Sequence, residues 1–338
     1  MTIDFRSDTF TKPSPAMLEA MFAAEVGDDV FGEDPTVRHL EQMLANMFGM
    51  DDALFCPSGT MANQVAIKAH TQPGDEIICE KLSHVYIYEG GGIAFNSGCQ
   101  VKPIEGKWGK ITAKQVEYAI NPIDLHKANT SLVSMENTSN RGGGTIYKIA
   151  ELEEIKNICL KYNLKYHLDG ARLWNALVET NESPKEYGRI FDSISVCLSK
   201  GLGAPIGSVL IGGKDFIYKA KRVRKVLGGG MRQAGYLAAA GIYALENNIQ
   251  LLKKDHTHAK MLAAALAKKD FIGEIAPVET NILIFEVKAP YTPEIFVGKL
   301  QKSNILCLPI SETQVRMITH LDITPEMIAT TIKTIESL

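Results

Sequence analysis

The stretch SVCLSKGLGAPIG, residues 195–207, places a single lysine between an apolar run and a group of glycines. Val196 and Leu198 precede Lys200, and Gly201 and Gly203 follow it. Taken alone, the pattern is typical of a buried strand that ends at the surface, where a lysine needs no special role. Whether Lys200 has a function depends on what lies at the ends of the other strands.

Short apolar strands followed by polar residues recur along the first two thirds of the chain. Residues 34–49 predict an amphipathic helix, with Asp34 as its N-cap and Pro35 at its first position. Further helices are expected from about residue 59 and over about 149–162. Because the strands are apolar on both faces, they are typical of a parallel sheet covered by helices. The strand segments are ALFC, DEIICE, TSLVSMENT, LKYHLDG and SISVCLS.

The C-terminal part of the chain has a different pattern. Two long helical segments, at about 232–248 and 251–269, lead into the strands NILIFEV and QVRMIT. The length of 338 residues also exceeds the usual size of one hydrophobic core. We therefore expect a large α/β domain with a mostly parallel sheet and an N-terminal arm over 1–245, and a smaller α+β domain over 246–338.

Composition favours a globular protein that binds small molecules. The net charge of −3, with both signs interspersed, gives no reason to expect a nucleic acid or an anionic membrane as partner. The longest apolar run, at 234–245, is shorter than the roughly 20 residues that span a bilayer. The six cysteines form no CxxC pair and no zinc-type spacing, so we expect free thiols and no metal site. Together with the charged N-terminal segment, they favour a cytoplasmic protein.

A second polar cluster follows an early strand. In PSGTMAN, residues 57–63, Ser58, Gly59 and Thr60 lead into a predicted helix. Free backbone N–H groups at a helix start suit a phosphate. The lysine of a P-loop is absent, and the segment could equally be an N-cap with no ligand.

A third cluster is HLDGAR, residues 167–172, where Asp169 ends a predicted strand. Asp169 lies 31 residues before Lys200, about the length of one βαβ unit, so both side chains can face one crevice. A plain N-cap role for Asp169 is the alternative. A phosphate cradle, a carboxylate and a lysine are what pyridoxal phosphate requires: a Schiff base with the lysine and a partner for the ring nitrogen. A nicotinamide site would instead need GxGxxG after an early strand, and GLGAPIG has the wrong spacing.

With these motifs in place, the chain resembles the L-threonine aldolases, pyridoxal phosphate enzymes of the aspartate aminotransferase fold, also called fold type I. The resemblance runs from about residue 3 to about 325. It implies retro-aldol cleavage of L-threonine or L-allo-threonine to glycine and acetaldehyde in a homo-oligomer, a dimer of dimers with shared active sites. The motifs that carry it are DFRSDTFTKPSPAML, GDDVFGEDPTV, PSGTMANQVAI, LDGARLWNA, CLSKGLGAPIGS, GGGMRQAG and RMITHLD.

The resemblance also assigns roles to residues. It implies that Lys200 carries the cofactor, that Asp169 pairs with the ring nitrogen, and that His84 stacks on the ring. Lys225 and Arg232 would reach the site of a neighbouring subunit. The full set implied for the cofactor is Lys200, Asp169, His84, Ser58, Gly59, Thr60, Arg172 and Arg232; that for the substrate is Ser7, Tyr88, His126, Arg172, Lys225 and Arg316.

Several points stay open on the sequence alone. The catalytic base is either His84 or His126, and His84 by itself reads as an exposed loop residue. Ser139, in MENTSNRGGGTI, stands where many relatives carry a histidine, which puts the role of this loop in doubt. A β-eliminating lyase, racemase or aminotransferase on the same fold is the alternative enzyme, and a cofactor-binding protein without turnover is the alternative class. The preference between threonine and allo-threonine is undetermined.

Overall fold

The computed structural model describes residues 2–338, and its largest element is a seven-stranded sheet in the order β2-β8-β7-β6-β5-β3-β4. Six strands are parallel, and β8 is antiparallel to both of its neighbours. The predicted strands are thus confirmed in a mostly parallel sheet. The strands are β2 (Asp52–Cys56), β3 (Asp75–Glu80), β4 (Gln100–Ile104), β5 (Asn129–Glu136), β6 (Lys165–Gly170), β7 (Ser193–Cys197) and β8 (Ser208–Gly212).

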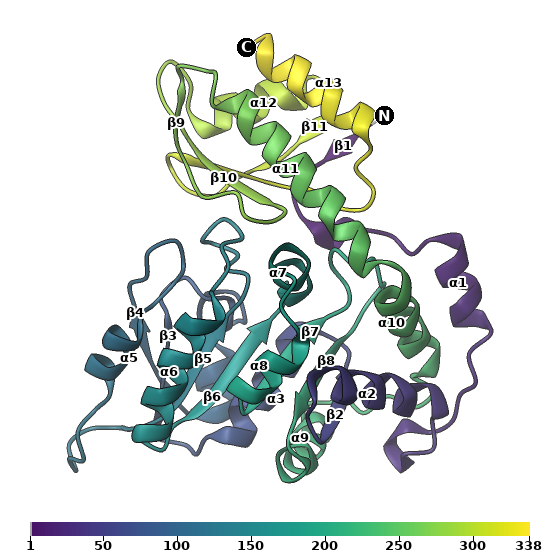
Figure 1. Cartoon of the computed structure of the whole chain (residues 1–338), viewed down its shortest axis with the longest axis vertical. Helices are drawn as coiled ribbons and strands as arrows, with labels where there is room; N and C mark the ends of the chain where they lie inside the picture. Colours follow the sequence, from purple (N-terminus) through teal and green to yellow (C-terminus); the bar gives the residue numbers. More distant parts are fainter. Residues whose placement is uncertain (1) are drawn as a thin grey trace.

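Helices cover both faces of this sheet (Figure 1). Leu54 of β2 packs with α3 and α9 on one face, whereas its neighbour Phe55 packs with α2 on the other. The strands are therefore apolar on both sides, as their sequences indicate. The helices are α1 (Pro15–Phe22), α2 (Pro35–Phe48), α3 (Gly59–His70), α4 (His84–Ile87), α5 (Ala113–Ala119), α6 (Ile149–Lys161), α7 (Leu173–Thr180), α8 (Pro184–Ile190), α9 (Lys214–Val226) and α10 (Gly235–Asn247).

The predicted signals of α2 are confirmed. Asp34 Oδ1 accepts hydrogen bonds from the backbone N–H groups of Thr36 at 3.1 Å and Val37 at 3.0 Å, as an N-cap does. Gly49 ends the helix with a φ of +65°, a conformation that glycine adopts at low cost. Short single turns, η1 (Asp8–Phe10), η2 (Asp29–Phe31), η3 (Ile93–Ser97) and η4 (Ile249–Leu251), complete the elements of this part.

The C-terminal domain is built on an antiparallel sheet in the order β12-β13-β10-β9. Its own core is separate from that of the large sheet. Figure 1 shows α10 and α11 leading from the large sheet to this domain. Its elements are α11 (Leu252–Leu266), β9 (Ile272–Ile275), β10 (Ile282–Val287), α12 (Pro293–Gln301), β11 (Ile305–Leu306), β12 (Leu308–Pro309), β13 (Gln314–Ile318) and α13 (Pro325–Glu336).

The first strand departs from the expected domain division. β1 (Ile3–Asp4) pairs in parallel with β11, and Ile3 and Phe5 are buried in the core of the C-terminal domain. The arm therefore belongs to that domain at its start and crosses to the large sheet only afterwards. Within residues 2–338, no helix is long and apolar enough to cross a membrane.

Candidate active site

A cavity of about 130 Å³ lies at the carboxyl ends of β2, β6 and β7. It brings together Lys200, Asp169, His84, Gly59 and Thr60, which come from four separate segments. Ligands bind at this edge in open parallel sheets. The complete lining is Gly59, Thr60, Asn63, His84, Asp169, Ala171, Ser195, Cys197, Ser199, Lys200 and Ser208.

The start of α3 offers unpaired backbone donors to the cavity. Ser58 Oγ accepts a hydrogen bond from the N–H of Met61 at 3.1 Å, so the Ser58 hydroxyl caps the helix and does not line the cavity. The N–H groups of Gly59 and Thr60 have no acceptor within the described chain. Nothing lies within 4 Å of a Cβ built on Gly59. The first turn of this 12-residue helix is therefore open to an anion.

Asp169 and Lys200 are brought to one edge by the register of three neighbouring strands. Asp169 is paired with Glu136 of β5 on one side and with Ser195 of β7 on the other. It is buried, and its Oδ1 accepts a hydrogen bond from the N–H of Ala171 at 3.0 Å. Lys200 follows the end of β7 by three residues and lines the same cavity. The carboxylate of Asp169 and the amine of Lys200 therefore line one cavity, as the spacing of the two residues in the sequence predicts.

His84 begins α4 and lines the cavity, so it is not a free loop residue. Its Nδ1 lies 3.0 Å from Glu89 Oε1, which leaves Nε2 without a partner in the described chain. Burial lowers the pKa of His84, but the hydrogen bond to Glu89 and the charge of Asp169 outweigh burial and raise the pKa above its ordinary value. Tyr88 is half exposed, with its ring 5.7 Å from that of His84.

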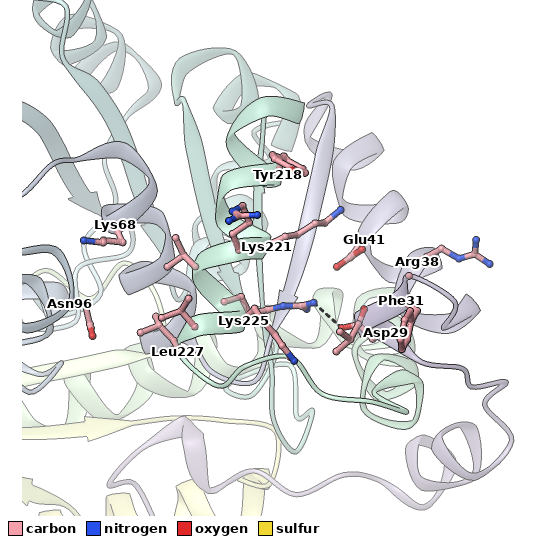
Figure 2. A pocket seen from close by; sticks show the side chains of 17 residues that line it. Asp29, Phe31, Arg38, Glu41, Lys68, Asn96, Tyr218, Lys221, Lys225 and Leu227 are labelled. Carbon is pink, nitrogen blue, oxygen red and sulfur yellow. Dashed lines mark hydrogen bonds and ion pairs between the residues drawn. The ribbon is translucent and has the colours of Figure 1, made fainter.

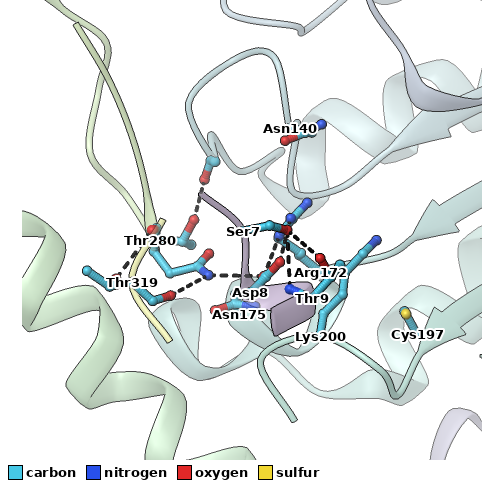
Figure 3. Close-up of polar contacts among 12 residues, drawn as sticks. Ser7, Asp8, Thr9, Asn140, Arg172, Asn175, Cys197, Lys200, Thr280 and Thr319 are labelled. Atoms are coloured by element: carbon cyan, nitrogen blue, oxygen red, sulfur yellow. Dashed lines mark hydrogen bonds and ion pairs between the residues drawn. The ribbon is translucent and has the colours of Figure 1, made fainter. Parts of the chain in front are cut away.

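Arg172 is held by a carboxylate that the sequence did not point to. Its Nε and Nη2 donate to the two oxygens of Asp8, each at 2.8 Å, and both side chains are buried (Figure 3). Burial would raise the pKa of Asp8, but the charge of Arg172 outweighs it and lowers the pKa to about 2. Ser7, the neighbour of Asp8, accepts hydrogen bonds from Thr9. Asp8 uses the Nε–H and one Nη2–H of Arg172, so both N–H groups of Nη1 and the second N–H of Nη2 are left for a ligand.

Arg316, on β13, reaches toward the same region from the C-terminal domain. Its Nη1 donates to Asn140 Oδ1 at 3.0 Å and its Nη2 to the carbonyl of Arg6 at 3.3 Å. Its Nε is buried and has no partner. Burial and the nearby charge of Arg172 lower the pKa of Arg316 to about 10. Two arginines that repel each other, each with an unused donor, favour an anion between them.

Comparisons with known proteins agree with this geometry. A family model described as "Beta-eliminating lyase" matches residues 4–290. The chain belongs to the beta-eliminating lyase family. It is 43% identical over 328 residues to the low specificity L-threonine aldolase of Escherichia coli strain K12, which covers 97% of this chain and 96% of the relative. It is 40% identical to the low-specificity L-threonine aldolase 1 of Arabidopsis thaliana, over 96% and 92% of the two chains.

The fold is shared as well. A solved threonine aldolase of Leishmania major superposes with a TM-score of 0.86 over 99% of both chains, at 22% sequence identity. The expected aspartate aminotransferase-like fold of the beta-eliminating lyase family is thereby confirmed, and so is the expected likeness to the threonine aldolases.

His126 is not where the resemblance led us to expect it. Its side chain is 93% exposed and its Nδ1 pairs with Asp124 at 2.9 Å. It precedes β5 at the amino end of the strand, whereas the cavity lies beyond Glu136 at the carboxyl end. A strand of eight residues spans roughly 26 Å. Within one chain His126 does not reach the cavity, so the role expected for it stays a prediction that requires a second subunit.

Lys225 and Arg232 also lie outside the cavity. Lys225 lines a larger hollow of about 910 Å³ between α9 and the segment 29–32, here called the α9 hollow (Figure 2). Arg232 is exposed and donates to Asp28 at 2.8 Å. Within one chain, neither residue reaches Lys200, so their expected roles require a second subunit. We assign the site to the smaller cavity because it carries the reactive side chains.

Besides Asp8, sequence reasoning missed two buried carboxyl groups that shape this site. Glu136 ends β5 and accepts hydrogen bonds from the N–H groups of His84 at 2.7 Å and Asn140 at 2.8 Å. Burial, assisted by the charge of Asp169, raises the pKa of Glu136 to about 7. Because Asn140 holds Arg316, Glu136 positions groups on both sides of the cavity. The strand-end rule that found Asp169 would have found Glu136 too.

Glu89 is the second buried carboxyl group that the sequence did not indicate, and it binds side chains of α3 and α4 next to the cavity. It accepts hydrogen bonds from Asn63 at 2.9 Å and Gln64 at 2.7 Å, besides its contact with His84. Single ligand-type atoms of His84, Glu89 and Asp169 lie within 4.8 Å of one another. Since N–H donors already occupy the Glu89 oxygens, we assign no metal to this cluster.

Ser139, which stands where many relatives carry a histidine, stabilises the loop over residues 139–145. Its Oγ accepts a hydrogen bond from the N–H of Gly142 at 3.2 Å, and its N–H donates to Thr145. Gly144 has a φ of +74°, and a Cβ there would lie 2.3 Å from Thr280 Oγ1 of the C-terminal domain. The glycines thus allow close contact between the domains, and Ser139 does not line the cavity.

The ion pair of Asp8 and Arg172 leads to a prediction on stability. Asp8→Asn should lower the free energy of unfolding at pH 7 by about 3–5 kcal/mol, because Arg172 would stay buried without its counter-ion. The pKa of Asp8 is lowered from 3.8 to about 2, so its contribution is present above pH 3.8 and is lost as the pH falls toward 2. The difference between variant and wild type should shrink over that window in urea unfolding.

Asp4→Asn is the matched control, since Asp4 forms a partly exposed pair with Arg6 in the same segment. This change should cost no more than about 1 kcal/mol. Equal losses for the two variants would contradict the importance given to the buried pair.

Proposed function

We propose that this protein is a pyridoxal-phosphate-dependent lyase that cleaves L-threonine and L-allo-threonine to glycine and acetaldehyde. The observation that carries the proposal is the meeting of Lys200, Asp169 and the free N–H groups of Gly59 and Thr60 in one cavity. The names of the relatives, low-specificity L-threonine aldolases, support the reaction and the substrate class.

The donors and acceptors of the cavity fit pyridoxal phosphate. Gly59 and Thr60 offer amides for its phosphate, Asp169 a carboxylate for its ring nitrogen, and Lys200 an amine for its aldehyde. His84 stands beside them and is suited to cover the ring. When bound, this cofactor takes up the amino group of a substrate and withdraws electrons from the bonds at its Cα.

Arg316 and Arg172 are suited to hold the substrate carboxylate. The Nε of Arg316 lacks a partner, and Nη1 of Arg172 is not used by Asp8. A carboxylate between them would satisfy these donors and offset the burial and the repulsion by Arg172 that together lower the pKa of Arg316. Ser7 and Tyr88 are proposed to line the same end of the substrate site.

His84 is the proposed base of the reaction. Glu89 accepts from Nδ1, so Nε2 is free to take the proton of the substrate β-hydroxyl as the Cα–Cβ bond breaks. The aldehyde leaves with the β-carbon, and Cα then receives a proton to give glycine. Glu89 compensates the positive charge that His84 acquires. The amine of Lys200 would hold the cofactor between turnovers.

We also propose an oligomer with shared sites. Phe31 is 74% exposed and Val226 is 86% exposed, and both line the α9 hollow together with Lys225. Apolar side chains around a basic hollow are suited to a second copy of the chain, which would bring Lys225 and Arg232 to the site of its partner. The six free and buried thiols support a cytoplasmic location.

A substrate panel tests the proposed function. Purified protein should release glycine from L-threonine, L-allo-threonine and phenylserine, and added pyridoxal phosphate should increase the rate of unloaded protein. The family description makes elimination the alternative reaction. Ammonia without glycine from all three substrates would overturn the proposal in favour of that alternative.

A further inference from the structure

A chain of hydrogen bonds, buried as far as Ser193, leads from Asp169 through the interior to His70, the last residue of α3. Asn63 Nδ2 lies 2.9 Å from Asp169 Oδ2, and Asn63 Oδ1 lies 3.2 Å from His167 Nε2. On the other side of its ring, His167 Nδ1 lies 2.8 Å from Ser193 Oγ, which lies 2.8 Å from His70 Nε2. Four contacts therefore join the carboxylate of the site to a residue far outside it.

The orientation of Asn63 follows from its neighbours. Asn63 Nδ2 lies 2.9 Å from Glu89 Oε1 as well as 2.9 Å from Asp169 Oδ2. Carboxylates accept hydrogen bonds and do not donate them, so the atom that faces both must be the amide nitrogen. Its Oδ1 must then accept, and it does so from the hydroxyl of Ser195 at 2.7 Å as well as from His167. His167 consequently carries its proton on Nε2.

The remaining links follow in the same direction. With its proton on Nε2, His167 accepts at Nδ1 from the hydroxyl of Ser193, whose oxygen then accepts from His70. Burial lowers the pKa of both histidines to about 3, so both rings are neutral. Every donor in the chain points toward Asp169, and aligned hydrogen bonds strengthen one another in an interior of low polarity.

We propose that His167 is a positioning residue that acts through Asn63 to hold the carboxylate of Asp169 aimed at the ring nitrogen of the bound cofactor. His167 lies on β6, is fully buried against α3 and does not line the cavity, so it touches neither substrate nor cofactor. The inference rests on the proposed function, because it concerns how that site holds pyridoxal phosphate.

The test compares two ligands that differ at one ring atom. Unloaded protein is titrated with pyridoxal phosphate and with its 1-deaza analogue, which has carbon in place of the ring nitrogen, and binding is followed by absorbance. His167→Leu should weaken binding of pyridoxal phosphate about tenfold or more. Binding of the analogue should change less than about threefold, because it has no ring nitrogen for Asp169 to hold. His167→Gln, which keeps a side-chain N–H, should recover most of the loss.

Matched variants separate this role from simple destabilisation. His256 is another buried histidine, bonded to Asn175 and Glu179 away from this chain of contacts, and His256→Gln should change neither affinity. If His167→Leu does not fold, Ser193→Ala tests the next link outward, with the same selectivity and a smaller loss.

Two results would overturn the inference: equal weakening of both ligands by His167→Leu, or no change in either. Failure of the proposed function would look different. In that case the wild-type protein itself would bind pyridoxal phosphate no better than a variant without Lys200.

Discussion

Lys200→Ala is expected to lower kcat for threonine cleavage by about 10⁴-fold or more and to abolish the visible absorption of the cofactor-loaded protein. Lys200 is the only lysine that lines the cavity among residues 2–338, so no nearby amine can replace it. The absorption arises from covalent attachment of the cofactor aldehyde to an amine. A spectrum recorded after loading and desalting, together with steady-state rates, measures both effects.

Lys161→Ala is the matched control, because Lys161 lies on α6 in an exposed pair with Glu117. It should leave the spectrum and kcat unchanged. If the protein with Lys200→Ala keeps the wild-type spectrum, Lys200 is not the attachment point, whatever happens to the rate.

Asp169→Asn is expected to have the second-largest effect, a fall in kcat of about 10²–10³-fold with weaker cofactor binding. The change keeps the size of the side chain but removes the negative charge that the ring nitrogen needs. It also leaves Lys200 in place, so the loaded variant should still absorb visible light. Loss of rate with retained absorption separates the role of Asp169 from that of Lys200.

Asp192→Asn serves as the comparison for Asp169. Asp192 precedes β7 at the amino edge of the same sheet, where it pairs with Lys156 at 3.3 Å. Its replacement can affect the sheet but not the cavity, so kcat should stay within about threefold. A variant at Asp169 that keeps a rate within the same range would contradict its assigned role.

The residues of the site that could be predicted from the sequence are those that directly follow a recognisable strand. Asp169 and Lys200 each follow a strand that is apolar on both faces, and the parallel sheet brings such strand ends to one edge. Gly59 and Thr60 follow a third strand and open a helix. These positions follow from the order of strands and helices along the chain alone. They can therefore be predicted without knowing any contact between distant segments.

Contacts between distant segments could not be read in this way. Asp8 and Arg172 are separated by 164 positions, and nothing near Asp8 indicates its partner. Asn63 reads as an ordinary helix residue until β6 is placed beside α3. Pairing of Ile3 with Ile305 likewise joins the two ends of the chain, which is why the domain of the first strand was missed.

The resemblance to a family was right about the fold and incomplete about geometry. It led to His126 as a possible base, but position in a motif does not say which edge of a sheet a loop occupies. His126 precedes β5, and the cavity lies beyond its far end at Glu136. His84 meets both conditions for a base, since it lines the cavity and is oriented by a carboxylate.

The products formed from L-threonine test the central claim most directly, because they report which bond is broken. Cofactor-loaded protein should convert L-threonine to acetaldehyde and glycine in equal amounts, with the aldehyde trapped as it forms and both products quantified. Cleavage of the Cα–Cβ bond is the only reaction considered for this site that yields that pair. Formation of 2-oxobutyrate and ammonia, with no acetaldehyde, would mean that the β-hydroxyl is eliminated instead, and would contradict the account.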